Sequence, residues 1–171
     1  MNGALEQELV RHVSIADLST DSPQKVEIEA DAAECAAIAG RLGILAVDSL
    51  KAEIELFRDL TGDVNLVGRI QADVRQACVV TLDPVEQQID TRIFQRFSGR
   101  DDDPEGDDED PVEPIIENEI EIGDIVVQNL ALALDPYPRA PGAAFEEVDD
   151  EAGKPTGPFA ALAALRDDTE N

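Results

Sequence analysis

The stretch that decides the fold is "VNLVGRIQADVRQACVVTLDPVEQQIDTRIFQRF", residues 64–97. Apolar and polar side chains alternate on both sides of a turn at "LDPV", residues 82–85. Such alternation is typical of β-strands with one buried face and one face in water. The stretch therefore predicts a β-hairpin. Its apolar positions are Val64, Leu66, Ile70, Ala72, Val74, Cys78, Val80 and Leu82 before the turn, and Ile89, Ile93 and Phe97 after it.

The same alternation occurs just upstream, in residues 50–56, where Leu, Ala, Ile and Leu alternate with Lys, Glu and Glu. "RDLTGD", residues 58–63, provides a short connection. Three half-buried strands joined by short turns predict an antiparallel meander. The middle strand is longer than usual, so we expect the sheet to bend strongly. The bent sheet could also close into a barrel, and the sequence does not decide between the two forms.

Two helices are expected beside this sheet. Asp31 and Glu34 have the spacing of a capping box, and Gly43 suits a helix C-cap, so residues 31–42 are predicted to be helical. Cys35 falls on the apolar stripe of this helix and is interpreted as an inert core thiol. A short strand at 120–122 is expected to lead into a second, heavily buried helix.

The second helix is predicted over residues 123–134, because Pro136 and Pro138 forbid its continuation. The proline-containing stretch "LALALDPYPRAPGA", residues 130–143, has two interpretations. It is either a simple helix terminator or a docking strip whose Tyr137 and Arg139 contact a partner.

The chain has 171 residues and a formal net charge of -26. Residues 98–118 hold ten acidic residues, which no core can accommodate. We therefore expect one α+β domain over residues 1–141, with a disordered acidic loop at 98–114. Residues 142–171 are predicted to form an acidic, largely disordered tail.

Several classes of function find no support in the sequence. The N-terminus lacks a signal-peptide pattern and no apolar run approaches the length of a membrane helix, so we expect a cytoplasmic protein with no membrane partner. His12 is the single histidine, and there is no Gly-rich phosphate loop. We expect no catalytic residues, metal, cofactor or small-molecule substrate.

The hairpin turn at residues 82–85 predicts which side chains face each other across the strands. It places Arg75 opposite Arg92, and Gln71 opposite Arg96. All four are on the solvent face by alternation. Like charges directly opposite each other are unfavourable, so an anion is expected nearby.

The turn at residues 58–62 likewise places Lys51 opposite Arg69. A cationic patch is therefore predicted on one sheet surface, formed by Lys51, Arg69, Arg75, Arg92 and Arg96. Two interpretations stay open: a solvated face neutralised by the chain's own carboxylates, or a surface that binds RNA or another partner. In the second case, deletion of residues 101–110 is expected to tighten RNA binding.

Two segments together resemble the bacterial YceD family. They are "VGRIQADVRQACVVTLDPVEQQID", residues 67–90, and "EIEIGDIVVQNLALALDPYPRAPGA", residues 119–143, with an acidic variable loop between them. The resemblance spans roughly residues 9–142. Some family members carry a second Cys three residues after the first, whereas this chain has Thr81 three residues after Cys78. One thiolate cannot make a tetrahedral zinc site, so Cys78 is interpreted as a packed thiol.

The resemblance implies a role in the accumulation of large-subunit ribosomal RNA, and hence in ribosome biogenesis. We expect a non-enzymatic factor whose partner is pre-ribosomal RNA, a pre-ribosomal particle or a basic ribosomal protein. The alternative is a metal-dependent nuclease that processes ribosomal RNA, which would need a compact carboxylate cluster outside the acidic loop.

Overall fold

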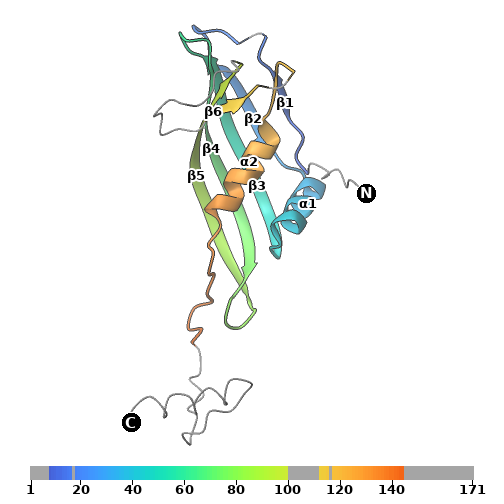
Figure 1. The fold of residues 1–171 in the computed structure, drawn as a ribbon. Helices are drawn as coiled ribbons and strands as arrows, with labels where there is room; N and C mark the ends of the chain where they lie inside the picture. Colours follow the sequence, from blue (N-terminus) through green and yellow to red (C-terminus); the bar gives the residue numbers. More distant parts are fainter. Residues whose placement is uncertain (1–7, 17, 100–111, 116, 145–171) are drawn as a thin grey trace, which may run out of the picture.

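The computed structural model describes residues 8–16, 18–99, 112–115 and 117–144 (Figure 1). Within them, two helices pack against a sheet of long strands. The elements follow in the order β1 (His12–Ser14), β2 (Gln24–Glu29), α1 (Ala32–Leu42), β3 (Ala46–Arg58), β4 (Val64–Ala77), β5 (Pro84–Ser98), β6 (Val112–Pro114), β7 (Glu119–Glu121) and α2 (Ile122–Ala133).

The main sheet has the strand order β2-β3-β4-β5-β6, and its first four strands are antiparallel neighbours. The meander of β3, β4 and β5 was predicted from the sequence, whereas the pairing of β2 with β3 was not. Closure into a barrel was the wrong alternative, because the sheet is open. A barrel needs its first and last strands to pair. Here β6 instead runs parallel to the end of β5, over Arg96–Ser98, and extends the sheet at that edge. The short strands β1 and β7 form a second, two-stranded sheet.

The helices form where the sequence predicts them. The Asp31 side chain accepts hydrogen bonds from the backbone N–H groups of Ala33 and Glu34, and the Glu34 carboxylate accepts one from the Asp31 N–H. This capping box satisfies backbone donors that have no partner inside the helix. Gly43 ends α1 in the left-handed conformation, with φ 65°.

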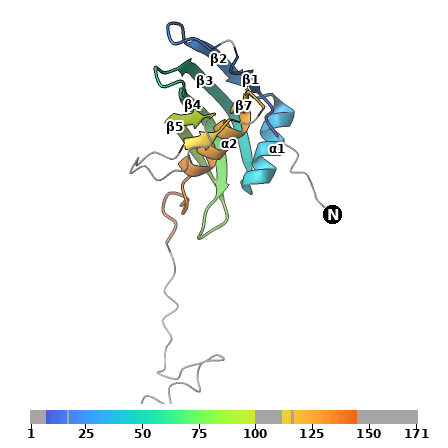
Figure 2. The same ribbon diagram turned by 45° about the horizontal axis from the view of Figure 1, so that its top comes forward.

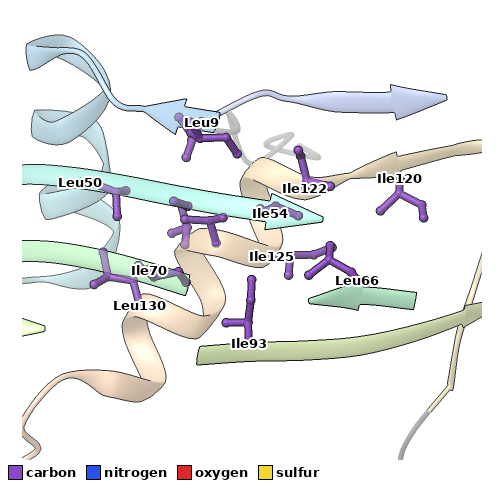
Figure 3. Close-up of a cluster of buried hydrophobic side chains, with 14 of the residues drawn as sticks. Leu9, Leu50, Ile54, Leu66, Ile70, Ile93, Ile120, Ile122, Ile125 and Leu130 are labelled. Atoms are coloured by element: carbon purple, nitrogen blue, oxygen red, sulfur yellow. The ribbon is translucent and has the colours of Figure 1, made fainter. Parts of the chain in front are cut away.

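Both helices pack on one face of the sheet, which we call the inner face. Buried side chains of α2, such as Ile125 and Leu130, point toward Ile54, Ile70 and Ile93 on the strands (Figure 3). Arg41 at the end of α1 forms an ion pair of 2.7 Å with Asp124 of α2, so the two helices are neighbours. Neither helix is long and apolar enough to cross a bilayer.

The hairpin between β4 and β5 turns earlier than predicted. Its loop begins at Cys78, whose N–H donates to the carbonyl of Asp83 (2.8 Å), and strand pairing resumes at Ala77 and Pro84. Val80 and Leu82 therefore belong to the turn rather than to the strand, and Leu82 is 76% exposed.

This earlier turn corrects the predicted register. Arg75 lies opposite Glu86 rather than Arg92, and Gln71 lies opposite Asp90 rather than Arg96. The pairing of β3 with β4 is also shifted. Instead of Lys51 facing Arg69, the pairs are Lys51 with Gln71 and Glu53 with Arg69.

The acidic segments are described only in part. The disordered acidic loop was predicted over residues 98–114. Its last three residues, Val112–Pro114, instead form β6 beside β5. Residues 100–111 lie outside the described residues, as do residues 145–171 of the predicted tail.

Candidate functional site on the outer face of the sheet

The face of β2–β5 that points away from the helices is called here the outer face, and in the described residues no helix covers it (Figures 1 and 2). Its side chains are those that alternate with the buried core residues of each strand. The five predicted basic residues lie there by this alternation. The corrected register decides which of them are neighbours.

Three of the five cations are neutralised by carboxylates of neighbouring strands. Lys51 Nζ lies 3.0 Å from a carboxylate oxygen of Glu29 on β2. Both side chains are exposed, so the pair is screened by water and salt. In this part of the surface, the chain supplies its own counter-charge.

Arg69 and Arg75 are held more firmly, each by two hydrogen bonds to one carboxylate. Arg75 donates from Nε and Nη2 to Asp48, both at 2.8 Å. Arg69 donates to Asp90, with an Nε–Oδ1 distance of 2.6 Å and a second contact from Nη2. The Arg69 hydrogen bond lowers the pKa of the Asp90 carboxyl, with a smaller contribution from the charge of Arg92.

Arg92 differs from these three. It lies directly opposite Arg69 on the neighbouring strand, and within the described part of the chain it forms no ion pair. Asp90 is already engaged by Arg69, which also lies opposite Glu53 on β3. Arg92 therefore presents a positive charge with which no carboxylate of the described residues forms an ion pair.

Phe94 is an exposed aromatic residue beside Arg92. It lies two residues from Arg92 and two from Arg96 on the same strand face, opposite the half-buried Val67, and its side chain is 59% exposed. Phe94 was not predicted as a site residue, because the alternation pattern was used to identify the buried positions of the strand. The available signal was an aromatic residue in the polar register of an alternating strand.

The two sides of the outer face differ in charge. A shallow depression of about 410 Å³ over β2, β3 and β4 is lined by Glu27, Glu29 and Glu53 as well as by Lys51 and Arg69. Glu27 and Glu53 lie directly opposite each other. The β2 side of the outer face is thus acidic, while the β5 side presents Arg92, Phe94 and Arg96 (the Phe94 patch).

Tyr137 and Arg139 lie away from the Phe94 patch. They belong to an extended segment after α2, which runs to the turn between β4 and β5 (Figure 1). There, Val79 N–H donates to the carbonyl of Pro138 (2.8 Å) and Gln76 Nε2 to that of Asp135 (3.0 Å). The segment therefore terminates α2 and is also fixed to the sheet. The Tyr137 side chain is 73% exposed.

Cys78 holds the same segment from inside the turn. Its buried Sγ accepts hydrogen bonds from the backbone N–H groups of Ala140 (3.3 Å), Val80 and Thr81 (both 3.4 Å). These N–H groups, that of Ala140 most of all, together with the Thr81 hydroxyl, lower the pKa of the Cys78 thiol to about 6. Cys78 is packed, as predicted from the sequence, but its hydrogen bonding distinguishes it from Cys35, whose pKa is raised by burial.

The described residues contain no group of three or more His, Cys, Asp or Glu side chains arranged to hold a metal ion. They include 21 acidic and 10 basic residues, so the folded part is acidic apart from the acidic loop and tail. The Phe94 patch is a small cationic and aromatic area on an otherwise acidic surface.

Comparison with known proteins identifies the family. No curated protein and no solved structure shows a significant match to the chain. A family model described as "Large ribosomal RNA subunit accumulation protein YceD" matches residues 66–166, which is more than half of the chain. The match continues beyond residue 142, where the resemblance noted from the sequence ended. The chain therefore belongs to the YceD family.

Proposed function

We propose that this protein supports the accumulation of large-subunit ribosomal RNA as a non-catalytic factor, by binding RNA of the pre-ribosomal particle through the β5 side of its outer face. The family description supplies the link to large-subunit RNA. The observation that carries the RNA contact is Arg92, a cation opposite another arginine and without an ion pair among the described residues.

The negative net charge opposes this contact less than the total suggests. At physiological ionic strength the screening length is about 8 Å. The carboxylates of β2 are three strand spacings from β5, which is roughly 14 Å. An RNA phosphate near Arg92 therefore interacts mainly with the side chains around Arg92, which include the Arg69–Asp90 pair, and only weakly with the carboxylates of β2.

A second candidate is the escort of a basic ribosomal protein. It is favoured by the excess of acidic over basic side chains in the folded part, 21 against 10. Opposite net charges attract partners over distance and speed their association. In this case the acidic β2 side of the outer face, rather than the Phe94 patch, would meet the partner.

Purification of the tagged full-length protein from its own cells, with and without nuclease treatment, separates the two candidates. We expect large-subunit RNA and ribosomal proteins to co-purify, and nuclease to release both. A basic protein that stays bound after nuclease would contradict the RNA proposal and favour the escort. Cleavage of the bound RNA when Mg²⁺ is added would contradict the non-catalytic role and favour the nuclease alternative.

Matched variants locate the contact. Arg92→Gln removes a cation without an ion pair among the described residues, whereas Arg75→Gln removes one that is already paired with Asp48 on the same face. We expect Arg92→Gln to lower the recovery of large-subunit RNA and Arg75→Gln to leave it near the wild-type level. Equal recovery from both variants would place the contact elsewhere on the molecule.

A further inference from the structure

The Phe94 patch has the composition of a surface that holds an unpaired nucleotide. Phe94 projects from the solvent side of β5 and is 59% exposed, although it is a large apolar side chain. Isolated exposed apolar residues are common on proteins. Here, however, the ring lies between Arg92 and Arg96 on one strand, each roughly 7 Å away along the strand.

Among the described residues, the ring lies near a part of the sheet edge that no strand pairs with. On the side of β5 away from β4, the described strand pairing is confined to Arg96–Ser98, which pair with β6. Opposite Phe94 lies Val67, an aliphatic residue that continues the apolar surface onto β4. A planar group can therefore lie on the ring and on Val67, with cations on both sides of it.

We infer that Phe94 is a stacking platform for a base of single-stranded RNA, with Arg92 contacting an adjacent phosphate. This inference rests on the proposed function and specifies which form of RNA is bound. An aromatic ring on a sheet surface can stack on a base that is free of its neighbours, and the flanking arginines match the charge of the backbone. Bases inside a duplex are stacked on each other, so a duplex offers only phosphates to this surface.

The cations and the ring have separable effects on binding. Each phosphate contact to a single strand contributes about 0.7 to the slope of log affinity against log salt concentration. Loss of the Arg92 charge should therefore reduce this slope. Loss of the Phe94 ring should weaken binding without altering the slope, because stacking releases no counterions.

The test measures fluorescence anisotropy of the full-length protein with two labelled probes over a range of salt concentrations. The probes are a single-stranded oligoadenylate of about 10 nucleotides and a fully paired RNA hairpin. We expect tighter binding of the single strand. Phe94→Ala should weaken it about tenfold at constant salt slope, and Phe94→Tyr should retain it. Arg92→Gln should reduce the slope by about 0.7.

Leu132→Ala is the matched control, since Leu132 is also a strongly exposed apolar side chain (85%) but belongs to α2, on the other side of the sheet. It should bind like the wild type. If Phe94→Ala binds like the wild type and the hairpin binds as tightly as the single strand, while Arg92→Gln still weakens binding, the stacking role is wrong and the proposed function stands. If the wild type binds neither probe, RNA binding itself is contradicted.

Discussion

The side chains on the two faces of the sheet interact in different ways. On the inner face, the residues of β3, β4 and β5 alternate into a core with both helices, and residues such as Ile54 and Ile70 are almost completely buried. On the outer face, charged side chains of neighbouring strands pair with one another, as in Arg75 with Asp48. The inner face depends only on which residues point inward. The outer face depends on register, because ion pairs need particular partners.

The largest difference between the faces should appear in stability. Ile70→Ala on the inner face removes a fully buried side chain and leaves a cavity, so we expect a loss of about 3 to 4 kcal/mol in the free energy of unfolding. Its neighbour Gln71 points to the outer face, and Gln71→Ala should change this free energy by about 0.5 kcal/mol or less. Urea unfolding measures both. Similar losses from the two variants would contradict the assignment of the faces.

The next largest loss of stability is expected where α2 lies close to the backbone of the N-terminal segment. A Cβ atom on Gly123, at the start of α2, would lie 1.9 Å from the carbonyl oxygen of Leu9. Gly123→Ala should therefore destabilise the protein by about 3 kcal/mol. Gly40→Ala in α1 is the control, because its Cβ meets nothing within 4 Å. We expect it to raise stability by about 0.5 to 1 kcal/mol. A neutral Gly123→Ala would show that α2 does not pack so closely on the N-terminal segment.

These two faces also explain how far the sequence predicts the fold. The inner face was predictable, because the period of two determines which residues are buried, and Asp31, Glu34 and Gly43 are local signals for the ends of α1. Register was not, since the Cys78 turn depends on a hydrogen bond within the loop to Asp83 and on one from the distant Ala140, neither of which alternation reveals. The corrected register keeps the same faces of β4 and β5 buried, apart from Val80 and Leu82 in the turn, but it separates Arg75 from Arg92. The sequence therefore identified the five basic residues of the outer face, but not the residues that lie opposite them.

The two cysteines provide a pH-dependent comparison. The pKa of Cys78 is about 6 in the folded protein and about 8.5 in an unfolded chain. Its hydrogen bonds therefore stabilise the fold fully above about pH 8.5, and this contribution is lost as the pH falls through 6. We expect the difference in unfolding free energy between wild type and Cys78→Ala to increase from pH 5.5 to pH 8.5.

Cys35→Ala is the control for this measurement, because the pKa of Cys35 is raised rather than lowered. Its difference from the wild type should stay constant up to about pH 7.5 and fall slightly by pH 8.5, where only the unfolded thiol ionises. If the Cys78→Ala difference does not increase with pH, the Cys78 thiol is not held as a thiolate, and the segment after α2 is fixed by its backbone contacts alone.

The smallest effect is expected for the ion pairs of the outer face. Arg75 and Asp48 are both more than 40% exposed, so water and salt screen their attraction. Arg75→Gln should leave the midpoint of urea unfolding close to the wild-type value at both low and high salt. A clear loss at low salt only would show that the outer-face pairs hold the strands together.

The central claim, that this protein supports large-subunit accumulation by binding through the Phe94 patch, is tested most directly by sucrose-gradient profiles of ribosomal subunits. The strains to compare lack the gene or carry the wild type, Arg92→Gln, Phe94→Ala or Arg75→Gln. We predict that deletion depletes large subunits and spares small ones, that wild type and Arg75→Gln restore the profile, and that Arg92→Gln and Phe94→Ala restore it poorly. Full restoration by both Arg92→Gln and Phe94→Ala would contradict the claim.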